Sequence, residues 1–518
     1  MRRLLSIPGI TVAIFFGWKV ALLLLTSQPI PSNDSFFYDG PVVNYVLHGE
    51  YCNPSLVQVL PISGTQVFSA YPPFYQAVLL GWMKCFGISE LAAMWFHLVL
   101  LAIFALTMLK IFRTLNLPPL VSNCAALFLF GITFHDRPDT LAHVLGALTV
   151  LAVVRGLMWS GAALLLLTFC TSLQIGGIYF LWTSGLIGLG VWMGRLKFPW
   201  AAISAFVLTI AALVALVKFK HPLFWAGFLE HVQVTPSFTG LRMPRADDLL
   251  KLIRTAPGIG LAIVGFIWLV AKSDLRTRLK QNPELAVGLA GALAALALIG
   301  GCLFVLTPNT IHIAGYLQPV VVGCFLAAFV KSSSLSFVPR VAVGGVVLGA
   351  LLLVSVRAVG MSTWGILCAR DVSRTEALRE VNRALDLVSP GDTVFVSAAY
   401  LYESARRTNV NSIHSDWPAQ PDGVDPEKTA IERLRPAALL LTQFDYYRRY
   451  EAVVAQFRRE RGDVEVEINN LARVQSPDAI PATRRIVQHI AWAPVIIEFK
   501  WPTQDATSAG EALQNENH

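Results

Sequence analysis

The chain has 518 residues, of which 55% are hydrophobic and 14% are charged, and its mean hydropathy is +0.57. This composition is too apolar for a soluble globular protein and predicts a polytopic membrane protein. The formal net charge of +8 does not indicate a nucleic-acid partner. Lys and Arg are instead spread over short loops between apolar runs, where they set membrane topology.

Apolar runs recur from Ile10 to Arg357, and runs of roughly 17 to 25 residues are long enough to cross the hydrocarbon core. We count about eleven such spans. Basic clusters fall at alternate ends of these spans if the first span, Ile10 to Leu25, runs outward and Pro72 to Phe86 does not cross. The scheme places the loop at residues 28–89, and everything after the last span, on the outer side of the membrane.

The first outer loop carries two acidic and aromatic segments, Ser32-Asn33-Asp34-Ser35-Phe36-Phe37-Tyr38-Asp39-Gly40 and Tyr71-Pro72-Pro73-Phe74-Tyr75. Carboxylates beside the hydrocarbon are costly to desolvate, so their presence indicates a functional site at the membrane surface. Two simpler interpretations remain open. Asp34 can cap a short helix from Ser35 onward, and Asp39 can be a turn residue.

A second polar cluster, His135-Asp136-Arg137-Pro138-Asp139-Thr140, opens the span that continues to Val153. Asp136 and Asp139 share a face if helical geometry starts early, although Pro138 more naturally occupies a first turn. Arg137 offers a planar, bidentate group for phosphate, and a salt-bridged helix start is the alternative. We interpret His97 and His143, which are lone histidines in apolar runs, as packed polar groups.

A basic group also lies on the outer side against the topology rule, at Lys218, Lys220 and His221. It can bind an anion there, and snorkelling of the lysines at a helix end is the alternative. The seven cysteines lie mostly in apolar runs without the spacing of metal ligands. We therefore predict no metal site from them.

After the last span, Val341 to Val356, the composition shifts toward charged residues, which predicts a separate outer domain at residues 361–518. Helical and strand-like patterns alternate in it, which predicts a soluble α/β layer domain. The helical segments are Thr375 to Val388, Pro426 to Arg433 and Tyr446 to Arg461. The strand-like segments are Thr393 to Ser397, Ala437 to Thr442, Val464 to Ile468 and Val495 to Phe499. The tail from Gln504 onward is polar and predicted to be disordered.

A series of short motifs follows the first span in a fixed order: Asp34, Tyr38, Gly49-Glu50-Tyr51, Tyr71-Pro72-Pro73-Phe74-Tyr75, Phe86-Gly87, Arg137-Pro138-Asp139 and Tyr316-Leu317-Gln318-Pro319. This order resembles the integral-membrane glycosyltransferases of the GT-C class, in the branch of the protein O-mannosyltransferases and lipid A aminoarabinose transferases. The resemblance covers about Ile10 to Phe329. It implies an α-helical polytopic GT-C fold for residues 1–360, with the outer juxtamembrane loop at residues 28–89.

Two departures from the pattern matter. Many relatives have a paired Asp-Glu after the first span, whereas Ser35 follows Asp34 here. The second acid is then Asp39 or Asp136. The late element usually carries a basic residue, for which His312 is the only near candidate.

The resemblance implies transfer of a sugar from a polyprenyl-phosphate-linked donor to a hydroxyl of a lipid, glycan or protein acceptor, at the outer face of the inner or plasma membrane. Asp34 matches the acidic position of the family and is the candidate general base, with Asp39 as a second catalytic acid. The candidate ligands of the donor phosphate are Arg137, Lys218, Lys220 and His221. The candidate acceptor or supporting residues are Asp136, Asp139, His135, Tyr38 and Tyr75. The sequence identifies no cofactor with certainty, and the participation of a divalent cation is left open.

Two functions from other classes compete with this one. A secondary transporter or lipid flippase places coupling charges near the bilayer midplane and often shows repeated halves. This chain shows neither feature, and its acids cluster at one interface. A non-catalytic membrane scaffold would leave the outer acids unexplained.

Overall fold

The structure is a computed structural model. It describes residues 7–26, 33–54, 61–65, 73–132, 137–234, 243–271, 275–304, 312–331, 349, 359–360, 374–389, 392–405, 410–412, 426–442, 445–446, 450–470 and 494–502. The predicted site residues His135 and Asp136 and the side chain of Asp34 lie outside the described part. So do the predicted last span, the predicted domain boundary at residue 361 and the predicted disordered tail.

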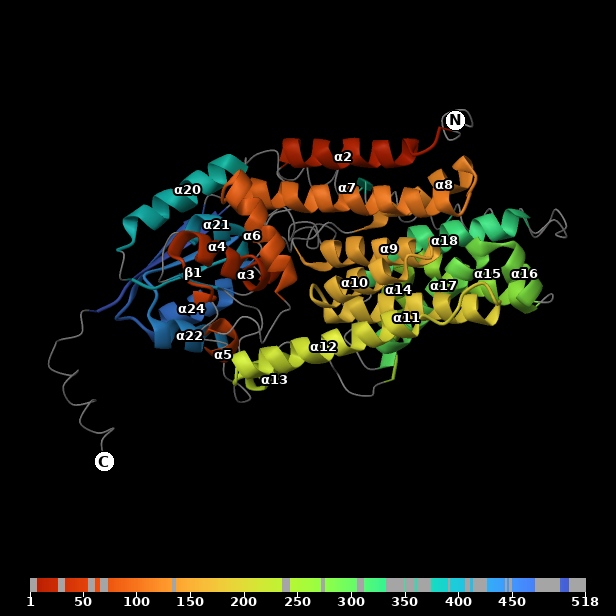
Figure 1. Ribbon diagram of the computed structural model, residues 1–518. Helices are drawn as coiled ribbons and strands as arrows, with labels where there is room; N and C mark the ends of the chain where they lie inside the picture. Colours follow the sequence, from red (N-terminus) through yellow and green to blue (C-terminus); the bar gives the residue numbers. More distant parts are fainter. Residues whose placement is uncertain are drawn as a thin grey trace.

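The described part of the chain is a long bundle of apolar helices with a small sheet at one end (Figure 1). Among the described residues, five helices are long and apolar enough to cross a membrane: α7 (Glu90–Thr114), α11 (Leu173–Trp192), α12 (Trp200–Lys220), α17 (Pro283–Phe304) and α18 (Ile313–Lys331). Five shorter apolar segments accompany them: α2 (Ile10–Thr26), α8 (Pro119–Ala126) with the 3-10 helix η3 (Leu127–Gly131), α9 (Asp139–Val154), α10 (Met158–Phe169) and α15 (Pro257–Ala271). The prediction of a polytopic helical membrane protein is confirmed.

Small residues let the central helices of the bundle approach closely. Gly146 of α9 faces the ring of Tyr179 in α11, and a Cβ at this glycine would lie 2.1 Å from the ring. Trp182, one turn further along α11, donates a hydrogen bond of 3.0 Å to the carbonyl of Val287 in α17. Because lipid tails supply little hydrophobic drive between helices, such close packing and hydrogen bonding hold a membrane bundle together.

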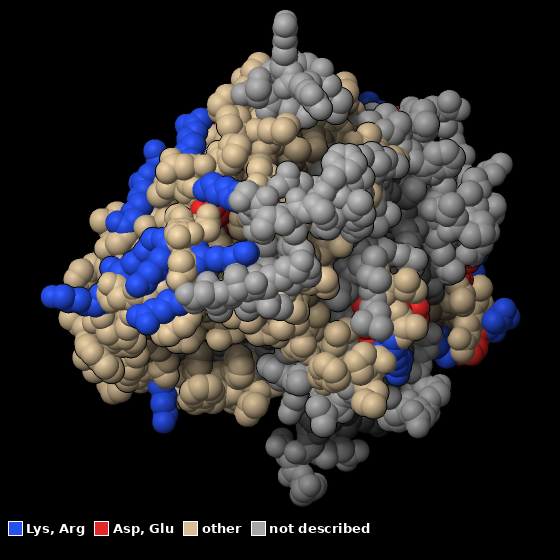
Figure 2. All heavy atoms as spheres, turned by 90° about the vertical axis from the view of Figure 1, so that its right-hand side faces the viewer, with Lys and Arg blue, Asp and Glu red and all other residues tan. Residues whose placement is uncertain are grey.

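Lys and Arg gather at the end of the bundle that lies opposite the sheet (Figure 2). They come from the end of α7, from the turns after α9 and α11, and from α16 (Leu275–Gln281). The residues are Lys110, Arg113, Arg155, Arg195, Lys197, Arg276, Arg278 and Lys280. We call this the basic end and the opposite one the sheet end. The arrangement agrees with the predicted alternation of basic loops.

A layer of short helices covers the sheet end of the bundle: α3 (Asn33–Tyr38), α4 (Gly40–His48), α5 (Pro61–Thr65) and α6 (Phe74–Phe86). We call it the juxtamembrane layer. Helix α6 has 13 residues, which at about 1.5 Å per residue is shorter than the hydrocarbon core. That Pro72 to Phe86 does not cross the membrane stays a prediction. Helix α3 begins at Asn33, so Asp34 lies inside its first turn and does not precede a helix from Ser35.

The C-terminal α/β region contains a five-stranded sheet with the strand order β2-β1-β3-β5-β4. Strands β2 (Val410–Ser412), β1 (Val394–Val396) and β3 (Ala438–Thr442) are parallel. Strands β5 (Pro494–Lys500) and β4 (Glu465–Asn470) continue the sheet in antiparallel pairing. The predicted α/β architecture is confirmed, with strand β2 added to the four predicted strands.

The helices of this region cover both faces of the sheet. Helix α20 (Arg374–Leu387) packs with Val394, Val396 and Leu440 on one face. Helices α22 (Pro426–Leu434) and α24 (Glu451–Glu460) pack with Phe395, Leu439 and Leu441 on the other. All five residues of β3 are buried, because this central strand is covered on both sides. The short helix α21 (Leu401–Ser404) follows β1, and its Tyr402 contacts the juxtamembrane layer through a hydrogen bond to Asp39.

Candidate functional site

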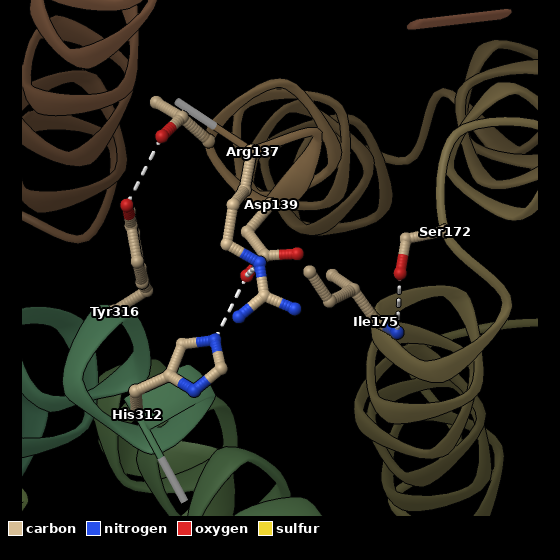
Figure 3. Close-up of polar contacts among 7 residues, drawn as sticks. Arg137, Asp139, Ser172, Ile175, His312 and Tyr316 are labelled. Carbon is tan, nitrogen blue, oxygen red and sulfur yellow. Dashed lines mark hydrogen bonds and ion pairs between the residues drawn. The ribbon is translucent and has the colours of Figure 1, made fainter. Parts of the chain in front are cut away.

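A charged cluster lies where α9 and α18 begin. The imidazole Nε2 of His312 lies 2.8 Å from Oδ2 of Asp139, and the guanidinium Nε of Arg137 lies 3.7 Å from the same oxygen (Figure 3). The side chains of Arg137 and His312 are 28% and 19% exposed, whereas that of Asp139 is 12% exposed. The carboxylate therefore holds two basic groups that remain accessible from outside the bundle.

The local sequence explains why Asp139 occupies this position. Pro138 adopts φ −60°, which is preorganised for a helix start, and α9 begins at the next residue. Asp139 thus stands in the first turn, where the helix dipole stabilises a carboxylate. Because Arg155 follows the other end of α9 at the basic end, the cluster lies on the side of the bundle that faces the sheet.

Buried aromatic and polar side chains form a floor beneath this cluster. The hydroxyl groups of Tyr316 and Thr140 lie 3.0 Å apart, and the rings of Tyr316 and His143 stack with centroids 4.1 Å apart. The Nδ1 atom of His143 lies 3.1 Å from the hydroxyl of Tyr179. These contacts join α9, α11 and α18, and they agree with the interpretation of His143 as a packed polar group.

The late motif Tyr316-Leu317-Gln318-Pro319 also fixes α15 against α18. The side-chain carbonyl of Gln318 accepts a hydrogen bond of 2.9 Å from the backbone N–H of Gly258. Its amide nitrogen donates one of 3.1 Å to the carbonyl of Thr255. Gln318 is fully buried, so these bonds satisfy a polar group that would otherwise be costly in the bundle. The motif therefore fixes the position of α18, which begins directly after His312, relative to α15.

A second acidic group, Asp39, lies in the juxtamembrane layer. Its carboxylate is fully buried and accepts hydrogen bonds from the hydroxyls of Tyr75, at 3.0 Å, and Tyr402, at 2.8 Å. The Tyr75 hydroxyl also lies 3.2 Å from Nε2 of His97 in α7, and the ring of Tyr38 stands edge-on to that of Tyr75. The structure thus brings together Asp39, Tyr38 and Tyr75, which the sequence predicted as site residues separately.

The burial of Asp39 bears on its predicted catalytic role. A carboxylate with no exposed surface cannot meet an incoming hydroxyl without a rearrangement, so its surroundings favour a positioning role. Its partner Tyr402 was not among the predicted site residues, because it lies 363 residues away in the C-terminal α/β region.

The basic residues Lys218, Lys220 and His221 stand at the end of α12. Both lysines are exposed, and neither forms an ion pair within the described residues. Helix α12 packs on α10 and α13 (Phe224–Val234), so the described contacts do not bring this group to Arg137. Their predicted role at the donor phosphate stays a prediction. In the described ranges, no three His, Cys, Asp or Glu side chains converge as metal ligands would.

Comparison with solved structures places the fold. ArnT from Cupriavidus metallidurans, solved with bound undecaprenyl phosphate, superposes with a TM-score of 0.53 at 13% sequence identity, over 94% of this chain and 97% of that one. The oligosaccharyltransferase of Archaeoglobus fulgidus superposes with a TM-score of 0.52 at 10% identity, over 86% of this chain and 70% of that one. No protein-family model and no curated protein matches the sequence. Both solved proteins are GT-C glycosyltransferases, and this chain therefore has the fold of the GT-C class, as its motifs predicted.

Proposed function

We propose that the protein is a membrane glycosyltransferase, which moves a sugar from a polyprenyl-phosphate-linked donor to a hydroxyl of a lipid, glycan or protein acceptor at the outer membrane face. The observation that carries the proposal is the accessible Arg137–Asp139–His312 cluster at the sheet end of a GT-C bundle. ArnT, which shares the fold, was solved with bound undecaprenyl phosphate. Basic groups at this level of the bundle suit the phosphate of such a lipid.

The chemistry at the donor needs charge neutralisation more than protonation, because a phosphate is a competent leaving group. A guanidinium can contact two phosphate oxygens at once. Asp139 orients Arg137 from one side, and the same carboxylate oxygen of Asp139 also contacts the imidazole of His312. The start of α9 adds the positive end of a helix dipole. Lys218, Lys220 and His221 remain proposed as a second basic group along the lipid phosphate.

The acceptor hydroxyl needs a general base, and we assign this role to Asp34. The residue lies in the first turn of α3, in the same juxtamembrane layer as Asp39. A carboxylate within hydrogen-bond reach of the hydroxyl takes its proton as the oxygen attacks the anomeric carbon, while the phosphate leaves with the electron pair of the broken bond. Asp39, which is buried between the end of α3 and the start of α4, then supports the base and does not replace it.

The function is tested by comparing lipid-linked sugars and envelope glycans of cells with and without the protein. Cells without it should accumulate one polyprenyl-phosphate sugar and lose one glycosylated product. Arg137→Ala should restore the product roughly 10- to 100-fold more slowly than the unsubstituted protein, because a charge-assisted phosphate contact contributes about 1.5–3 kcal/mol. Arg137→Lys keeps the charge without the planar fork, so its activity should fall between the two.

The matched control is Arg113→Ala, which removes an exposed guanidinium at the basic end. It should restore the product fully. If Arg137→Ala and Arg137→Lys both behave like this control, Arg137 is only a helix-start residue and the donor phosphate binds elsewhere. If the two cell types have the same lipid-linked sugars and glycans, the proposed function is wrong.

The proposed membrane orientation follows from the basic end, because Lys and Arg are retained on the cytoplasmic side. Single cysteines replacing Thr65 in α5 and Arg383 in α20 should react with an impermeant thiol reagent added to intact cells that carry the otherwise cysteine-free protein. A cysteine replacing Thr277 in α16 should react only after the membrane is opened. Labelling of position 277 alone in intact cells would place the charged cluster on the cytoplasmic side.

A further inference from the structure

The C-terminal α/β region is joined to the rest of the protein by buried polar contacts. Arg374, the first residue of α20, donates a hydrogen bond of 3.1 Å from Nε to Oε1 of Glu90, the first residue of α7, and a second one from Nη2 to Oε2. Tyr402 reaches Asp39 from α21. The 3-10 helix η5 (Ala398–Tyr400), which connects β1 to α21, packs against α3. The region therefore contacts the helix that carries Asp34.

The hydrogen bonds of Asp39 continue across several elements of the fold. They run from Tyr402 in α21 through Asp39, which precedes α4, and Tyr75 in α6 to His97 in α7. These four side chains are buried, with Tyr402 6% exposed and the others 1% or less. A polar network in such surroundings holds its members in one arrangement, because each lost partner leaves a buried group short of a hydrogen bond.

The carboxylate of Asp39 is used for this network and not for its own helix. Asp39 occupies the N-cap position of α4, where an Asp side chain ordinarily accepts a hydrogen bond from a backbone N–H of the first turn. Here its side chain makes no such bond. It turns instead toward the two tyrosine hydroxyls. A local cap would have served helix stability alone, whereas this arrangement connects the juxtamembrane layer to the C-terminal α/β region.

We propose that Tyr402 is a positioning residue of the active site, so that the C-terminal α/β region completes the site that the membrane bundle and the juxtamembrane layer begin. The inference rests on the proposed function. By holding Asp39, Tyr402 fixes the link between α3 and α4 and thereby the place of α3 relative to α6. Without this contact α3 samples other positions, and the base that it carries meets the acceptor hydroxyl less often.

The test is Tyr402→Phe, which keeps the ring and removes the hydroxyl. Its kcat should fall about 10- to 100-fold, since one hydrogen bond to a charged group is lost from the network. Its KM for the donor should stay unchanged, because the proposed ligands of the donor phosphate, Arg137 before α9 and the basic group at the end of α12, lie outside this network. Asp39→Asn should also lower kcat, and the two changes together should lower it by less than the product of their separate effects, because both break the same contact.

The matched control is Tyr450→Phe, which removes a hydroxyl from a buried tyrosine in the core beside α24. This core lies on the face of the sheet opposite the one that α20 covers. Its kcat should equal that of the unsubstituted protein. Hydrogen exchange of the full chain gives a readout that does not depend on transfer. Backbone amides of α3 and α4 should exchange faster in Tyr402→Phe than in Tyr450→Phe, while those of α20 and β3 should exchange alike.

A Tyr402→Phe protein with unchanged kcat would overturn the proposal. So would unchanged exchange in α3 and α4, or faster exchange throughout the C-terminal α/β region, which would show a loss of structure in place of a loss of position. If the unsubstituted protein transfers no sugar, the proposed function fails. The exchange of α3 and α4 still decides whether Tyr402 holds the juxtamembrane layer.

Discussion

Asp34→Asn should lower the rate of sugar transfer by at least about 100-fold, while the protein keeps its thermal stability and its affinity for the donor. Asn has nearly the same shape and keeps an acceptor oxygen, but it cannot take a proton from a hydroxyl. A general base contributes roughly 10²- to 10⁴-fold to a rate, whereas a carboxylate that only stabilises the first turn of a helix contributes about 0.3–1 kcal/mol of local stability. Transfer and thermal unfolding measured on the same purified variant separate the two roles.

Two further Asp→Asn variants complete this experiment. Asp392→Asn changes an exposed residue before β1 and should leave both transfer and stability unaltered. Asp39→Asn should lower both, because an amide oxygen accepts less strongly than a carboxylate from the hydroxyls of Tyr75 and Tyr402. Full activity of Asp34→Asn would show that Asp34 is not the general base. The role would then fall to another residue of the juxtamembrane layer.

The fold could be predicted from the sequence to the extent that it depends on local patterns. A membrane span is recognised by its own length and apolarity. The helices and strands of the C-terminal α/β region are recognised by hydrophobic patterns that repeat every few residues. The predicted helix at Thr375 to Val388 and the observed α20 therefore differ by one residue at each end. Strand β2 has three residues, which is too short for an alternating pattern to be recognised.

The candidate site could be predicted only as separate residues. Asp39 and Tyr75 stand in two motifs of one loop, and nothing local indicates that a tyrosine 363 residues from Asp39 completes the pair. His312 and Asp139 are 173 residues apart. His312 was singled out only because it precedes the late tyrosine motif. Partners of this kind are chosen by tertiary packing, which a single sequence does not record.

The ion pair between Arg374 and Glu90 gives the second large expected effect, on stability. The two residues are only 5% and 7% exposed, and they are joined by two parallel hydrogen bonds. Burial lowers the pKa of Arg374, but the contacts with Glu90, together with the nearby Tyr400 and Glu403, outweigh this effect, so the pKa lies above its ordinary value and the guanidinium stays charged. Burial raises the pKa of Glu90, and Arg374 opposes that rise with its charge and its hydrogen bonds. The pair is thus a nearly dry, hydrogen-bonded contact between α20 and α7.

Arg374→Met should destabilise the contact by about 3–5 kcal/mol, because it leaves the carboxylate of Glu90 buried without its cation. The expected result is a lower unfolding temperature and rapid proteolysis within the C-terminal α/β region. Adding Glu90→Leu removes the uncompensated charge and should recover much of the loss. Recovery should be incomplete, since Arg374 also donates a hydrogen bond to the carbonyl of Ala399. Recovery of stability by the second substitution is expected only if the side chains of Arg374 and Glu90 are in contact.

The control for this prediction is Arg383→Met in the same helix. The side chain of Arg383 is 78% exposed and lies 4.0 Å from Glu380, and an exposed pair of this kind contributes about 0–1 kcal/mol. If Arg374→Met is no less stable than this control, the buried pair does not hold the C-terminal α/β region to the bundle. Tyr402 and η5 would then have to hold it against the juxtamembrane layer without that pair, and Tyr402→Phe would itself release the region. The stability of Arg374→Met thus decides between two roles of Tyr402. Either Tyr402 only positions the juxtamembrane layer, or it also holds the C-terminal α/β region to the rest of the protein.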